Sequence, residues 1–168
     1  VPVDLVATTA GPTVLILHED GSYSAQEFRQ GRWGAVGLPP LTGTARLGTV
    51  NDMLGLLDVT DTKIQHWWKS DEGWSAPEVT MGLGAVIEVV QVDDRLLIMT
   101  ESESNQFALN FLGPQGVAKL GTWPQEQDIP WSILGYRGLP VLVRADEQLE
   151  LSEIDPLPGV QDSWRVFT

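Results

Sequence analysis

The sequence predicts an all-β fold in which four antiparallel, four-stranded sheets follow one another along 168 residues. An apolar run recurs four times, at 13–17, 53–59, 95–100 and 140–144. In each repeat, an aromatic or branched residue ends the third strand. These residues are Phe28, Trp68, Phe111 and Ile154, and successive ones are 40, 43 and 43 positions apart. Helical spacing of apolar residues fails almost everywhere, and 17 Gly and 11 Pro interrupt the chain. A period of this length is typical of repeat folds whose units bury apolar faces against one another.

The strands of one repeat differ in pattern, and each pattern has a structural meaning. The second strand is a continuous apolar run, which is typical of a strand covered on both faces. The third alternates, as in KIQHWW (63–68), which indicates one face in contact with water. Asp20-Gly21 predicts a type I′ hairpin between the second and third strands of the first repeat. A Trp opens or anchors the last strand in three repeats, at Trp33, Trp74 and Trp164.

These patterns give the bounds of the strands within one predicted domain. For the first repeat, 1–41, we expect strands at 3–8, 13–18, 23–29 and 32–37. For the second repeat, 42–81, we expect 44–50, 53–59, 63–68 and 74–80. For the third repeat, 82–126, we expect 85–91, 95–100, 106–111 and 117–122. For the fourth repeat, 127–168, we expect 130–134, 141–144, 148–154 and 163–167.

Four-stranded antiparallel units of this length, stacked side by side, resemble the blades of a β-propeller. The resemblance covers the whole chain and depends on period and pattern. A β-sandwich also has short strands at this spacing, but it gives no reason for a four-fold register. An open array of blades would expose the apolar faces of its first and last sheets. We therefore expect the four blades to close on themselves, or a partner to complete a larger ring. That partner is a second copy, giving eight blades, or a neighbouring part of a longer protein.

Charge and composition exclude several classes of function. The net charge of −13, with only 10 Lys and Arg, argues against partners that present phosphate, namely nucleic acids and anionic membranes. The absence of Cys excludes disulfides and thiolate metal sites. The two His residues stand 48 positions apart and predict no zinc cluster, and no stretch has the ligand spacing of a calcium loop. We therefore predict no cofactor, with a structural Ca²⁺ at the mouth of the ring as an alternative that no motif supports. An exported or cell-surface setting is slightly favoured over the cytoplasm.

Catalytic signals are weak. No Gly-x-Ser-x-Gly elbow occurs. Glycoside cleavage requires two carboxylates close together, and Glu19, Glu126 and Asp128 are the candidates for that role. In a propeller, the turns between second and third strands share a face with the connections between blades. We expect acidic residues of this set, such as Asp58 and Asp61, to make that face acidic.

Aromatic residues beside charged groups are the better candidates for binding. HWWKSDEGW (66–74) and QEFRQGRW (26–33) resemble lectin propellers of the fucose-binding type, and KSDEGW (69–74) resembles the Asp-box turn of sialidase propellers. The first resemblance implies a Trp platform that stacks on a sugar. Adjacent residues of a strand point to opposite sides, so Trp67 or Trp68 should be exposed or lie at an interface. Trp33, Trp74 and Trp164 should instead anchor the core between blades.

The sequence thus predicts a non-catalytic binding or interaction module built on propeller blades. Its alternatives are a carbohydrate-binding, lectin-like propeller and a fragment of a glycoside hydrolase or lyase propeller. The predicted ligand-binding or partner-binding residues are Trp67, Trp123, Trp131 and His66.

Overall fold

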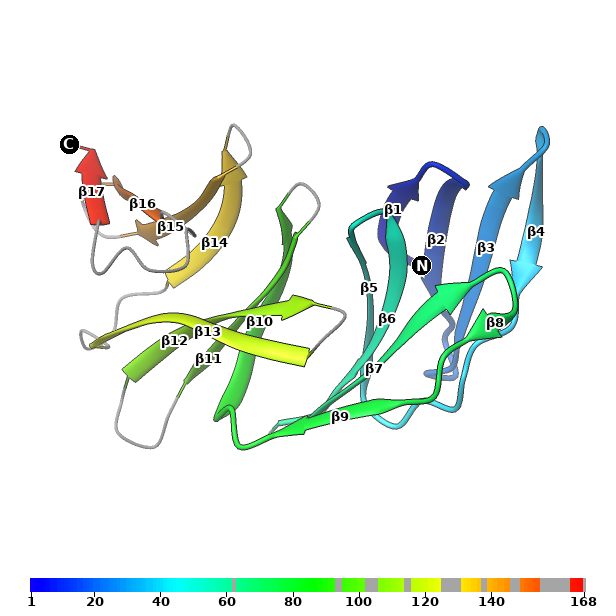
Figure 1. Cartoon of the computed structure of the whole chain (residues 1–168), viewed down its shortest axis with the longest axis horizontal. Helices are drawn as coiled ribbons and strands as arrows, with labels where there is room; N and C mark the ends of the chain where they lie inside the picture. Colours follow the sequence, from blue (N-terminus) through cyan, green and yellow to red (C-terminus); the bar gives the residue numbers. More distant parts are fainter. Residues whose placement is uncertain are drawn as a thin grey trace. The chain divides into compact units, whose positions relative to one another are not determined.

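The computed structural model contains antiparallel sheets whose strands pair in sequence order (Figure 1). It describes residues 1–61, 63–92, 95–101, 106–113, 116–124, 131–136, 139–145, 149–154 and 164–167, with side chains as far as residue 122. Strand pairing stays inside each quarter of the chain, which confirms the predicted all-β array of blade-like sheets. Contacts between residues divide the chain into two compact units, Val1–Gly82 and Leu83–Thr168. The described part has no helix that is long and apolar enough to cross a membrane.

The first sheet follows the predicted strand bounds closely. It contains β1 (Pro2–Thr8), β2 (Gly11–Leu17), β3 (Tyr23–Arg29) and β4 (Arg32–Val36). The turn between β2 and β3 differs from the predicted type I′ hairpin, because Gly21 has a φ of 83° while Asp20 is not in the positive-φ region. The Asp20 carboxylate accepts the Ser22 N–H at 2.9 Å, which closes a turn on the side chain instead. Positive φ at two successive residues occurs between β3 and β4, at Gln30 and Gly31.

The second sheet completes unit 1 and contains one departure from prediction. Its strands are β5 (Thr44–Val50), β6 (Met53–Val59), β7 (Lys63–Ser70), β8 (Gly73–Trp74) and β9 (Glu78–Met81). The predicted strand 74–80 is divided into β8 and β9, which pair with different parts of β7. The Ser75 hydroxyl accepts the Trp68 N–H at 3.1 Å, and Pro77 has no N–H to donate. The chain therefore leaves the sheet between the two short strands.

Unit 2 repeats the same sheet plan. Its first sheet has β10 (Ala85–Val92), β11 (Arg95–Glu101), β12 (Gln106–Gly113) and β13 (Gly116–Pro124). Its second sheet has β14 (Trp131–Tyr136), β15 (Leu139–Ala145), β16 (Leu149–Ile154) and β17 (Trp164–Phe167). Val92, Leu97, Met99 and Leu109 form a buried cluster in the first of these sheets. The buried Asn110 amide donates to the Ile98 carbonyl and the Thr100 hydroxyl, so its amide N–H groups are paired.

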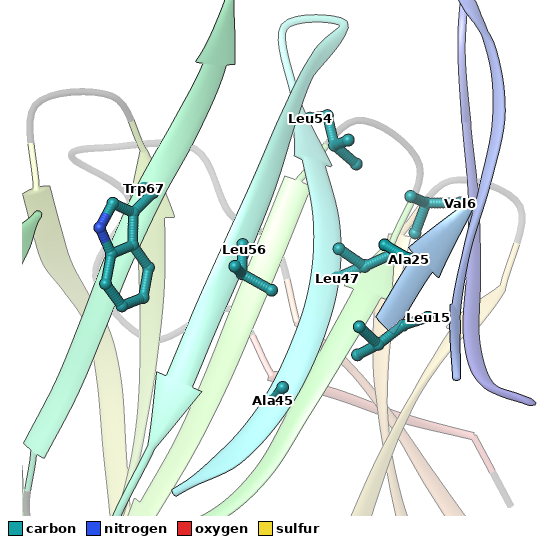
Figure 2. Packing of buried hydrophobic residues seen from close by; sticks show 8 residues of the cluster. All are labelled: Val6, Leu15, Ala25, Ala45, Leu47, Leu54, Leu56 and Trp67. Atoms are coloured by element: carbon teal, nitrogen blue, oxygen red, sulfur yellow. The ribbon is translucent and has the colours of Figure 1, made fainter. Parts of the chain in front are cut away.

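The core of unit 1 lies between its two sheets (Figure 2). It contains Val6, Leu15, Ala25, Ala45, Leu47, Leu54, Leu56 and Trp67. Leu15 and Leu56 are fully buried, and each such side chain contributes about 1.5–3 kcal/mol to stability. Polar contacts join the same two sheets. The Arg46 guanidinium lies 3.0 Å from the Asp4 carboxylate, which also accepts the Leu47 N–H at 3.0 Å.

Candidate ligand groove

A groove of about 450 Å³ opens at one end of the first sheet. One wall is the turn between β2 and β3, and the other is the connection from β4 to β5. Its lining residues are Gly21, Ser22, Tyr23, Ser24, Val36, Leu38, Pro39, Leu41, Thr42 and Gly43. This confirms, for the first repeat, that the turn between second and third strands shares a face with the connection between sheets. Small-molecule sites have volumes of about 300–1000 Å³.

The connection wall is fixed by Asp58, which is 1% exposed. Its carboxylate accepts the N–H and the hydroxyl of Thr42, each at 2.9 Å, and the Gly43 N–H at 2.5 Å. A Cβ at Gly43 would lie 2.2 Å from the carbonyl oxygen of Val59, so only glycine fits this position. The Trp74 indole N–H donates to the Gly37 carbonyl at 2.6 Å. The connection is thereby held to the second sheet by backbone and side-chain bonds.

The turn wall contains two serines, and the hydroxyl of each is hydrogen-bonded to a neighbouring side chain. The Ser22 hydroxyl donates to the Asp20 carboxylate at 2.6 Å. The Ser24 hydroxyl lies 2.8 Å from Nε2 of His18, in a hydrogen bond whose direction depends on the histidine tautomer. Hydrogen bonds from the side chain and backbone of Ser22 lower the pKa of Asp20 below its ordinary value. Since Asp20 stays charged at neutral pH, the Ser22 oxygen keeps its lone pairs free to accept a further bond.

The lining combines hydroxyl groups with aliphatic side chains. Ser22, Tyr23, Ser24 and Thr42 carry hydroxyl groups, and Val36, Leu38, Pro39 and Leu41 carry aliphatic side chains. The described lining includes no Asp, Glu, Lys, Arg or His. Such a surface accommodates an uncharged ligand with apolar faces and several hydroxyl or amide groups.

The two predicted binding residues in unit 1, Trp67 and His66, are buried and do not line this groove. Trp67 is 4% exposed and belongs to the core cluster between the two sheets, and Trp68 is 8% exposed, so neither is exposed and only the interfacial alternative is left. Neighbouring residues of β7 point to opposite sides of the strand. Since both Trp side chains are buried, both faces of β7 are covered. His66 is 1% exposed, and its Nε2 lies 3.4 Å from the Glu78 carboxylate. Burial lowers the pKa of His66, and the Glu78 charge opposes that shift.

The other candidates divide between the turn and the undescribed parts of the chain. Glu19 is exposed in the turn between β2 and β3 but does not line the groove. Trp123 lies in β13 and Trp131 in β14, and their side chains are outside the described residues, so their binding role stays a prediction. Glu126 and Asp128 also lie outside the described residues. No group of three or more His, Asp or Glu residues is placed to hold a metal ion in the described chain.

Two further expectations need correction. Asp58 was expected on an acidic face, but it is buried and holds the connection between sheets. Trp33 was expected to be a buried anchor, but it is 48% exposed. Its ring instead contacts Phe28, with centroids 5.3 Å apart. Trp74 does pack against the core cluster, as expected.

The fold is that of β-propeller blades, and comparison with solved structures shows it directly. An Aleuria aurantia lectin mutant in complex with Fucα1-6GlcNAc is similar, with a TM-score of 0.56 and 9% identity. A structure described as a fungal lectin with a six-bladed β-propeller fold and a novel fucose recognition mode has a TM-score of 0.57 and 10% identity. In each case 98% of this chain aligns, and the chain spans 60% of the lectin. No protein-family model and no curated protein matches the sequence.

Proposed function

We propose that this chain is a non-catalytic carbohydrate-binding module and that the groove of the first sheet holds a neutral saccharide. The observation that carries the proposal is the groove lining, which joins four hydroxyl-bearing residues to four aliphatic ones without a charged side chain. Saccharides have the matching chemistry, because their ring carbons form apolar patches and their hydroxyls both donate and accept hydrogen bonds. The similar solved structures are lectins in complex with fucose-containing ligands, which supports the same class of ligand.

The fixed hydroxyls favour binding without large rearrangement. Ser22 and Ser24 are already held by Asp20 and His18, so the ligand need not order them on binding. The opposite wall is held by Asp58 through Thr42 and Gly43. A groove with two fixed walls loses less conformational entropy on binding than a groove made of free loops.

Binding rather than cleavage is proposed because the described lining contains no carboxylate pair. Retaining and inverting glycosidases place two carboxylates on opposite sides of the scissile bond. Asp20 does not line the groove, and its carboxylate accepts the hydrogen bond of the Ser22 hydroxyl, so it acts on the groove through that side chain.

A glycan array followed by calorimetry tests the proposal. We expect the folded chain to bind neutral glycans and the double variant Ser22→Ala, Ser24→Ala to bind them about tenfold more weakly, from the loss of hydrogen bonds worth about 0.5–1.5 kcal/mol each. Ser70→Ala is the matched control, because its hydroxyl is exposed and bonds locally to Gly73. A folded chain that binds no glycan, or a double variant with unchanged affinity, would refute the proposed site.

A further inference from the structure

The turn wall of the groove uses its hydrogen-bond donors within the turn itself. The Gly21 N–H donates to the His18 carbonyl at 3.0 Å. The Ser22 N–H donates to the Asp20 carboxylate at 2.9 Å, and the Ser22 hydroxyl donates to the same carboxylate at 2.6 Å. Each of these groups has a single proton, so none has a second one to donate to a ligand. The Ser22 oxygen keeps its lone pairs and acts toward a ligand as an acceptor.

The connection wall has the same arrangement around a different carboxylate. Thr42 donates both its N–H and its hydroxyl to Asp58, each at 2.9 Å. The Gly43 N–H donates to Asp58 at 2.5 Å, and Pro39 has no N–H. Thr42 therefore offers a ligand the lone pairs of its hydroxyl oxygen and no proton. Each wall of the groove thus contains one hydroxyl that acts as an acceptor.

The two carboxylates also strengthen these acceptors. A hydroxyl that donates to a charged group carries more negative charge on its oxygen, so it accepts a further hydrogen bond more strongly. Ser22 and Thr42 are the two lining residues with this property, one on each wall. Tyr23 can donate or accept, and the role of Ser24 depends on the tautomer of His18. The fixed part of the groove's polar surface therefore calls for donors on the ligand.

We propose that the groove selects its ligand by hydrogen-bond donors, so that a saccharide binds through two free hydroxyl groups that donate to Ser22 and Thr42. This inference rests on the proposed function and specifies which groups of the saccharide are recognised. An ether oxygen, ester oxygen or fluorine at either position places an acceptor against an acceptor and leaves both unpaired. A site that pairs a ligand hydroxyl discriminates against the analogue that lacks it. An amino group at the same position keeps a donor and is tolerated.

Deoxyfluoro sugars test the inference, because fluorine is close to a hydroxyl in size but cannot donate a hydrogen bond. The probes are the methyl glycosides of glucose, galactose, mannose and fucose, each compared by calorimetry with its singly deoxyfluorinated derivatives. We expect one or more of the four parent glycosides to bind and two ring positions of each binder to lose about tenfold in affinity on fluorination. The amino derivative at each of those positions should bind at least as tightly as the parent.

Variants of the chain connect each sensitive position to its acceptor. Ser22→Ala removes one acceptor, so fluorination at one of the two positions should then change the affinity by less than about twofold. Thr42→Val should have the same effect at the other position. Ser70→Ala is the matched control, because its hydroxyl bonds locally to Gly73 and does not line the groove. This control should keep both losses.

Two results would overturn the inference while leaving saccharide binding intact. One is a parent glycoside that binds but loses affinity on fluorination at fewer than two positions. The other is a pair of losses that stays unchanged in Ser22→Ala or in Thr42→Val. Binding by none of the four parents would also overturn it, and the glycan array then decides separately whether the proposed function fails with it. Ser22 and Thr42 are exposed, so both variants should keep the wild-type circular dichroism spectrum. If Thr42→Val does not, the Ser22→Ala comparison decides alone.

Discussion

Replacing Asp58 by Ala should strongly destabilise unit 1. The carboxylate is 1% exposed and accepts three hydrogen bonds, from the N–H and hydroxyl of Thr42 and the N–H of Gly43. Hydrogen bonds to a charged group contribute about 1.5–3 kcal/mol each. Thr42 and Gly43 line an open groove, where water can replace part of what is lost. We therefore expect a loss of about 3–5 kcal/mol in the free energy of unfolding, at or below the lower end of the sum for three such bonds.

Urea denaturation followed by circular dichroism measures this loss, and Asp61→Ala is its control. Asp61 follows the same strand and loses the same charge, but it is exposed, so we expect a change within about 0.5 kcal/mol. Any folded Asp58→Ala protein should also bind glycans more weakly, because the wall at 38–43 loses its support. A change below about 1 kcal/mol for Asp58→Ala would refute the view that this carboxylate fixes the groove.

Three further predictions concern the core. Leu56→Ala should cost about 2–5 kcal/mol in unfolding free energy, because it leaves a cavity at a fully buried site, while Leu5→Ala, at a 68% exposed site, should change it by less than about 1 kcal/mol. Gly55→Ala should destabilise the chain by about 1–3 kcal/mol, because a Cβ there would lie 2.7 Å from the Trp68 ring; a neutral result in thermal unfolding would show that the ring moves freely. The pKa of His66 is lowered below 6.5 in the folded chain, so the unfolded chain takes up this proton first and stability should fall as pH decreases through about 6.5. His66→Leu should flatten that part of the profile, and an unchanged slope would contradict the assignment.

The strands could be predicted because apolar runs, alternation and turn residues are local signals. The predicted second strand 53–59 agrees with β6 residue for residue. Coverage of a face is not local, which explains why neither the burial of both Trp67 and Trp68 nor the exposure of Trp33 could be predicted. Alternation gives the side to which each residue points, but another sheet decides whether that side is buried.

The groove was missed for a related reason. Its two walls are separated along the chain, and they are fixed by the backbone N–H groups of Thr42 and Ser22, which donate to the carboxylates of Asp58 and Asp20. Ser, Leu and Pro in loops are common and carry no recognisable motif. The expected sharing of one face by turns and connections was the only signal in the sequence that pointed to this place.

Mapping a bound glycan by NMR tests the central claim most directly. The chain is labelled with ¹⁵N and titrated with the neutral glycans that the array selects, or with a panel of neutral monosaccharides if it selects none. The account predicts saturable shifts in the amides of 21–24, 38 and 41–43, which line the groove. No shifts, or shifts confined to residues outside these segments, would contradict it.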